Sequence, residues 1–138
     1  MIQFFYLYAI GLNAVKDNRK ALGYINKILN EFPREANPLY FVKTELINIL
    51  IHFELENFEL VPALAKGFKR KYKQDIHLCS LEFILISFVS NASNNPVQKN
   101  KHRLELKNML EYPDFQIPKP DFFMDFYCKW IKKTLSFL

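Results

Sequence analysis

One group of side chains in this 138-residue sequence has residue types that could bind a metal ion or transfer a proton. His52 is followed by Glu54, Glu56 and Glu59 within eight positions. An imidazole beside carboxylates can form a metal site or an acid–base pair. The same residue types are also typical of the solvated end of a helix, where Glu59 would favour the positive start of the next helix. We favour this second interpretation.

Other residues that could carry chemistry are not arranged in a known motif. The three glycines, Gly11, Gly23 and Gly67, are far apart, so they cannot form a phosphate-binding loop. The sequence has no HExxH, CxxC or paired Cys/His spacing, which disfavours zinc. Cys79 and Cys128 lie among apolar residues and are expected to be buried free thiols in a reducing cytoplasm. The sequence therefore predicts no enzyme, no cofactor and no metal site.

A basic segment is the sharpest surface feature of the sequence, and we call its five cations the basic ridge. They are Lys66, Lys69, Arg70, Lys71 and Lys73. All but Lys71 share one side of a helix, opposite an apolar side. The ridge would suit an acidic protein segment, a phosphate or a nucleic acid. The alternative, which we favour, is a solvated helix face whose lysine stems cover apolar surface.

The composition favours one folded domain of 16.5 kDa, because 50% of the residues are hydrophobic and 24% are charged. Few glycines argue against a nucleotide-binding α/β fold and against a small β-barrel. The net charge of +5 permits an acidic partner but is small for a dedicated nucleic-acid-binding protein. The apolar stretch 2–12 lacks signal-peptide features and is too short to span a membrane, so we expect a cytoplasmic protein.

Apolar residues recur at three- and four-residue steps along most of the chain, which predicts helices. The expected helices cover residues 2–15, 18–32, 37–53, the segment from the turn at 56–57 to about 73, 75–90, 98–111 and 121–137. Pro62 falls either inside the first turn of the fourth helix or just beyond it, and the pattern leaves both open. Loops are expected at 91–96 and around Pro113, Pro118 and Pro120. Because no strand signal is present, the predicted fold is all-α with antiparallel neighbouring helices.

The first two helices resemble a tetratricopeptide repeat (TPR), a helix–turn–helix unit of about 34 residues. Setting Pro33 at the closing proline of the motif places Ala9 and Ala21 at the small positions where the two helices approach closely. Phe5 and Leu12 then fall at large positions. Ile28 departs from the motif, because a third small residue belongs there. The second unit, residues 36–73, resembles a degenerate helical repeat.

A more specific resemblance rests on the run 45–60, the basic segment 66–73 and the late run Phe126-Tyr127-Cys128-Lys129-Trp130. These segments are similar to the C-terminal region of uncharacterised bacterial TPR-like proteins. The resemblance implies one TPR-like domain over residues 1–138, built as a short α-solenoid of about seven helices. The resemblance supplies no known activity. The apolar first helix separately suggests that the chain is the C-terminal piece of a longer repeat array.

These observations predict a non-catalytic scaffold that binds a protein or peptide in a groove between stacked helix pairs. The candidate groove residues are Tyr6, Asn13, Tyr40, Lys43 and Asn48. The alternative is a helical domain that binds a polyanion or nucleic acid through the basic ridge. The first helix lacks a polar outer face, so it is expected to pack in a longer array or a homodimer, unless the C-terminal helices cover it.

Overall fold

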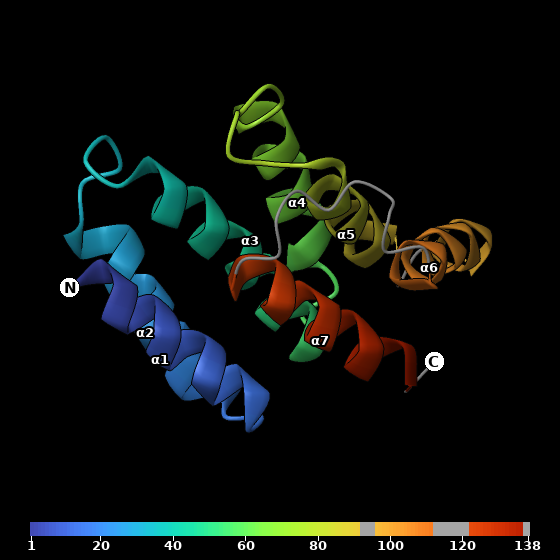
Figure 1. Ribbon diagram of the computed structural model, residues 1–138, viewed down its shortest axis with the longest axis horizontal. Coiled ribbons are helices and arrows are strands. Elements are labelled where there is room, and N and C mark those ends of the chain that lie inside the picture. Colours follow the sequence, from blue (N-terminus) through green and yellow to red (C-terminus); the bar gives the residue numbers. More distant parts are fainter. Residues whose placement is uncertain (92–95, 112–121, 137–138) are drawn as a thin grey trace. The chain divides into compact units, whose positions relative to one another are not determined.

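A computed structural model describes residues 1–91, 96–111 and 122–136 (Figure 1). These residues form seven helices and no strand, which confirms the all-α prediction for the described part of the chain. The helices are α1 (Ile2–Ala14), α2 (Asn18–Glu31), α3 (Pro38–Glu54), α4 (Leu60–Lys71), α5 (Ser80–Asn91), α6 (Pro96–Glu111) and α7 (Phe122–Ser136). Within these ranges no helix combines the length and the apolar character needed to cross a bilayer.

The chain divides into two compact units, Met1–Leu78 with helices α1–α4 and Cys79–Leu138 with helices α5–α7. The single domain expected over residues 1–138 stays a prediction. The loop predicted around Pro113, Pro118 and Pro120 lies outside the described residues, as do residues 92–95 of the other predicted loop.

The N-terminal unit is a series of neighbouring helices in chain order, with α1 against α2, α2 against α3, and α3 against α4. Ala9 and Ala21, the two small residues of the predicted close approach, are both fully buried. Helix α2 has one apolar side, formed by Ala21, Ile25 and Ile28, and its opposite side is polar. Burial of this side against apolar neighbours stabilises the helix, because α2 is too short to be stable alone.

The two helix pairs of this unit are closed by the same kind of turn. After α1, Lys16 has a φ of 63°, and after α3, 40 residues later, Glu56 has a φ of 62°. In each turn the next residue's N–H bonds the carbonyl five residues back, Asp17 to Leu12 at 2.8 Å and Asn57 to His52 at 3.0 Å. This is the hydrogen-bond pattern of a helix that ends on a left-handed residue. The unit therefore contains two hairpins with one common turn.

Pro62 is the third residue of α4, so it lies inside the first turn. The N–H groups of a first turn have no partner within the helix, and a proline there removes no hydrogen bond. Of the two positions that the sequence left open for Pro62, the structure has the one that costs no hydrogen bond.

The predicted start of the fifth helix at Asp75 is wrong, because α5 begins at Ser80. The Asp75 carboxylate accepts a hydrogen bond of 2.8 Å from the backbone N–H of His77 and closes a turn. The carbonyl of His77 in turn accepts a bond of 2.8 Å from Lys43 Nζ. These two bonds hold the backbone before Ser80 in a non-helical path.

In the C-terminal unit α6 packs against both α5 and α7. The largest fully buried side chains among the described residues of this unit are those of Trp130, Tyr127 and Phe88. In α7 the buried residues Phe123, Tyr127, Trp130 and Ile131 recur at three- and four-residue steps, as expected for the core side of a helix. Among the described residues of this unit, Glu82 is an acidic residue that is fully buried.

Candidate functional site

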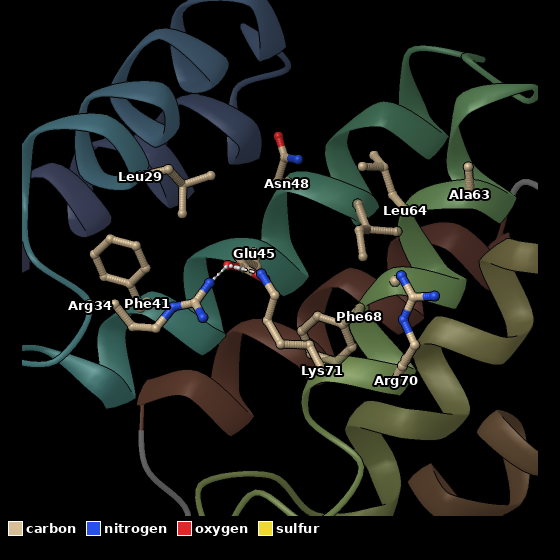
Figure 2. Close-up of a pocket in the computed structure, with 12 residues that line it drawn as sticks. Leu29, Arg34, Phe41, Glu45, Asn48, Ala63, Leu64, Phe68, Arg70 and Lys71 are labelled. Carbon is tan, nitrogen blue, oxygen red and sulfur yellow. Dashed lines mark hydrogen bonds and ion pairs between the residues drawn. The ribbon is translucent and has the colours of Figure 1, made fainter.

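The N-terminal unit contains a cavity of about 650 Å³ between α2, α3 and α4 (Figure 2). Its apolar lining comes from all three helices and consists of Leu29, Phe41, Ile49, Ala63, Leu64 and Phe68. Pockets of this volume with mostly apolar walls and a few polar groups are typical of ligand sites. The sequence did not predict this cavity, because it depends on how three separate helices pack.

Gly67 is part of the cavity lining on α4. A Cβ atom built on Gly67 would meet no other atom within 4 Å, so the missing side chain leaves open space. A glycine inside a helix costs about 1 kcal/mol relative to alanine. Packing therefore does not require a glycine at position 67, but the cavity is wider there because glycine has no side chain.

The polar rim of the cavity is mostly cationic. Arg34, Arg70 and Lys71 line it together with one carboxylate, that of Glu45. Glu45 Oε1 lies 3.2 Å from Arg34 Nη2 and 3.2 Å from Lys71 Nζ. In Figure 2 the Arg34 and Lys71 side chains both point toward Glu45, and Arg70 borders the cavity on α4. Three cations against one carboxylate leave the rim positive.

The Tyr72 ring contacts two cations of this charged group. Its side chain is buried, with Arg34 Cζ 5.9 Å and Lys71 Nζ 5.5 Å from the ring centroid. Cations over an aromatic face are attracted by the electron density of the ring. Burial, followed by the negative charge of Glu45, raises the pKa of Tyr72 well above its ordinary value. Tyr72 therefore stays neutral and holds the two cations in place without adding charge.

Three of the five predicted groove residues are buried. The exposed fractions of the Tyr6, Asn13 and Lys43 residues are 1%, 1% and 3%. The Asn13 amide donates hydrogen bonds to Asn18 and to Glu54, which joins the turn after α1 to the end of α3. These side chains therefore have no surface to offer a partner in this structure.

The other two predicted groove residues, Tyr40 and Asn48, are half-buried. Asn48 lines the cavity, whereas the Tyr40 ring packs edge-on against the Tyr6 ring at a centroid distance of 5.7 Å. The structure thus brings one of the five predicted groove residues to the cavity.

The basic ridge is placed on α4 and the turn that follows. Lys66, Arg70, Lys71 and Lys73 are exposed, and Lys69 is half-buried, which lowers its pKa. Arg70 and Lys71 belong to both the ridge and the cavity rim. Lys71, the ridge residue that the sequence placed off the main stripe, is the one that contacts Glu45.

The possible metal or acid–base group at His52 is dispersed by the fold. Glu54 bonds Asn18 at 3.1 Å and also accepts from Asn13, while Glu56 is exposed in its left-handed turn. His52 Nδ1 lies 2.9 Å from the side-chain amide of Asn57, and burial lowers the pKa of His52. In the described residues no group of three His, Cys, Asp or Glu side chains is placed to hold a metal ion.

Cys79 and Cys128 are free thiols, as predicted, although each is half-buried rather than buried. Burial raises the pKa of the Cys128 thiol, with Lys132 lowering it and Asp125 raising it. A thiol with a raised pKa is a poor nucleophile at neutral pH.

The outer side of α1 is apolar and exposed. Phe4, Leu7 and Tyr8 are at least half exposed, as the sequence predicts for a first helix without a polar face. A homodimer through this side stays a prediction.

Comparison with protein-family models, with curated proteins and with solved structures found no match to this chain.

Proposed function

We propose that this chain is a non-catalytic scaffold for protein–protein interaction and that its N-terminal unit binds a peptide segment of a partner between α2, α3 and α4. The observation that carries the proposal is the cavity of about 650 Å³ with an apolar lining and a charged rim. Its volume suits one or two large side chains, and the rim offers hydrogen-bond donors for orientation.

The repeated hairpin supports a TPR-like arrangement, which we include in the proposal. In both helix pairs of the N-terminal unit the first helix ends on a left-handed residue, and the two turns share one hydrogen-bond pattern. Stacked helix pairs with a constant turn form the extended binding surfaces of solenoid proteins. A scaffold of this class acts through shape and surface charge, and we place it in the cytoplasm because its two cysteines are free.

The test uses peptides selected from an unbiased random library against the full chain, with a cavity-filling variant as the probe. Gly67→Leu projects a side chain into the cavity, and Gly23→Leu adds the same side chain on α2 away from it. Neither Cβ would meet an atom within 4 Å, so both variants are expected to fold. Circular dichroism checks the fold.

We expect the selected peptides to bind the natural chain and Gly23→Leu alike and to lose at least about tenfold in affinity on Gly67→Leu. Equal binding to all three proteins, or a library that yields no binding peptide, would overturn the proposal.

A second candidate function is polyanion binding by the basic ridge, which is favoured by the exposure of Lys66 and Arg70 on α4 and of Lys73 in the turn that follows. Charge reversal at Lys66 and Lys73, neither of which lines the cavity, separates this function from peptide binding. Retention on heparin that disappears in Lys66→Glu/Lys73→Glu and falls steeply with salt would support it. Unchanged retention would reject it.

A further inference from the structure

We propose that the cavity selects an acidic peptide, in which a large apolar side chain is flanked by Asp or Glu, and that Glu45 occupies the position of the peptide's carboxylate when the cavity is empty. This inference rests on the proposed peptide-binding function and names the chemistry of its ligand.

The charge around the cavity is complementary to an acidic segment. Arg34, Arg70 and Lys71 stand at the edge of an apolar lining, and Glu45 is the one carboxylate among the lining residues. A partner that buries an apolar side chain here brings its neighbouring residues against this rim. Carboxylates at those positions are attracted by the rim, whereas lysines or arginines are repelled.

The basic ridge continues the same charge along α4. Arg70 and Lys71 are shared by rim and ridge, and two further exposed cations continue the ridge, Lys66 on α4 and Lys73 in the turn after it. An acidic segment anchored in the cavity can therefore follow α4 beyond the rim. A nucleic acid would use the ridge but would gain little from the apolar lining, which favours a peptide over a polyanion.

Glu45 already shows how a carboxylate is held at the rim. It receives Arg34 from the turn after α2 and Lys71 from the end of α4, at 3.2 Å each. The two cations are positioned by the Tyr72 ring as well, so they are placed for a carboxylate before a ligand arrives.

The contacts of Glu45 are weak enough to be exchanged. The Arg34 and Lys71 side chains are 44% and 43% exposed, so solvent screens both ion pairs, although the Glu45 side chain is only 19% exposed. A peptide carboxylate that replaces Glu45 makes equivalent contacts, but the charge of Glu45 stays nearby and repels it. Glu45 therefore lowers the affinity for acidic peptides and excludes weakly binding ones.

The experiment compares three blocked hexapeptides that share a central Leu-Phe pair and differ in the two residues on each side, which are acidic, neutral amides or lysines. Acetylated and amidated ends ensure that only side-chain carboxylates are tested. Each fluorescent peptide is titrated into the natural chain, Glu45→Gln, Arg34→Gln/Lys71→Gln and Gly67→Leu.

We expect the natural chain to bind the acidic peptide at least about tenfold more tightly than the neutral one, and the lysine peptide most weakly. Glu45→Gln is expected to raise the affinity for the acidic peptide about three- to tenfold and to leave the neutral peptide unchanged. Arg34→Gln/Lys71→Gln should reduce the acidic peptide to the level of the neutral one. Gly67→Leu should weaken both.

Equal binding of the acidic and neutral peptides, or an unchanged affinity in Glu45→Gln, would overturn this inference. If Gly67→Leu still lowered the affinity for both peptides, the proposed peptide-binding function would stand, although the preference for acidic peptides would be rejected. Acidic binding that Gly67→Leu leaves intact and that a heparin hexasaccharide displaces would assign the charge to a polyanion site and would also overturn the inference. Thermal unfolding of Glu45→Gln controls for its fold.

Discussion

Tyr127 on α7 donates a hydrogen bond of 2.7 Å to the carboxylate of Glu82 on α5, and both side chains are fully buried. The other carboxylate oxygen accepts from the backbone N–H of Cys79 at 3.0 Å. Cys79 directly precedes α5, so Glu82 reaches back to cap the helix start as in one half of a capping box. A single carboxylate thus fixes the beginning of α5 and ties this helix to α7.

Removing the hydroxyl in Tyr127→Phe is expected to lower the free energy of unfolding by about 1–3 kcal/mol, because the buried carboxyl of Glu82 loses a hydrogen-bond donor. Urea denaturation followed by circular dichroism measures the change. Tyr8→Phe, at an exposed tyrosine of α1, is the matched control and should change stability by less than about 0.5 kcal/mol. Equal effects of the two variants would show that the Glu82 bond contributes nothing.

Asn13→Ala is expected to destabilise the N-terminal unit by about 1–3 kcal/mol, because the Asn13 amide donates to Glu54 and Asn18 from a fully buried position. Asn30→Ala, at an exposed position of α2, should instead stabilise the helix slightly. Chemical denaturation distinguishes the two variants. If Asn13→Ala kept full stability but lost peptide binding, Asn13 would be a groove residue after all.

Glu56→Gly is expected to raise the free energy of unfolding by about 1 kcal/mol, because Glu56 has a left-handed φ of 62° that glycine adopts without strain. Lys66→Gly places the same residue inside α4 and should lower stability by about 0.5–1 kcal/mol. Thermal and urea unfolding of both variants test the sign. A loss of stability in Glu56→Gly would mean that the glutamate side chain outweighs its backbone cost.

The stability of the protein is expected to fall on acidification through a contribution from His52. Burial lowers the folded-state pKa of His52 below its ordinary value of 6.5, and the Asn57 amide donates to Nδ1 when that nitrogen carries no proton. As the pH falls below 6.5, His52 binds a proton more readily in the unfolded chain than in the folded chain. The free energy of unfolding therefore decreases.

His52→Gln removes this titration. Urea denaturation between pH 8 and pH 5 should show the natural chain losing stability relative to His52→Gln below about pH 6.5. A stability difference between the two proteins that stays constant across this range would contradict the prediction.

Most of the fold could be predicted from local signals in the sequence. Pro38 at the first position of α3 and Asp17 before α2 are both helix starts in the structure, with Asp17 accepting a 3.4 Å bond from the Lys20 N–H. The start of α5 could not be predicted, because Lys43, 34 residues away from His77, holds the preceding turn.

Most of the candidate site could not be predicted from local signals in the sequence. Glu45 meets Arg34 and Lys71, which are 11 residues before it and 26 after it, and these separations become contacts only when α2, α3 and α4 pack. Lys43 and Asn13 were predicted as groove residues because the first helix of each repeat usually lines the groove of a solenoid, yet each is buried with bonds to distant partners. Two local signals could have pointed to the site: Glu45, an acid among apolar residues of α3, and a glycine inside α4.

The common turn at Lys16 and Glu56 has a consequence for how such a chain can lengthen. Because each hairpin closes through the same backbone geometry, tandem duplication of a 40-residue stretch would reproduce a complete hairpin with its own closure. The copied segment would need no new turn, because its two helices would be joined by the same backbone geometry. Its helices would pack against helices like those of the original hairpin. Growth by whole hairpins is therefore open to this architecture, whereas insertion of a few residues into a helix would shift its buried side by a fraction of a turn.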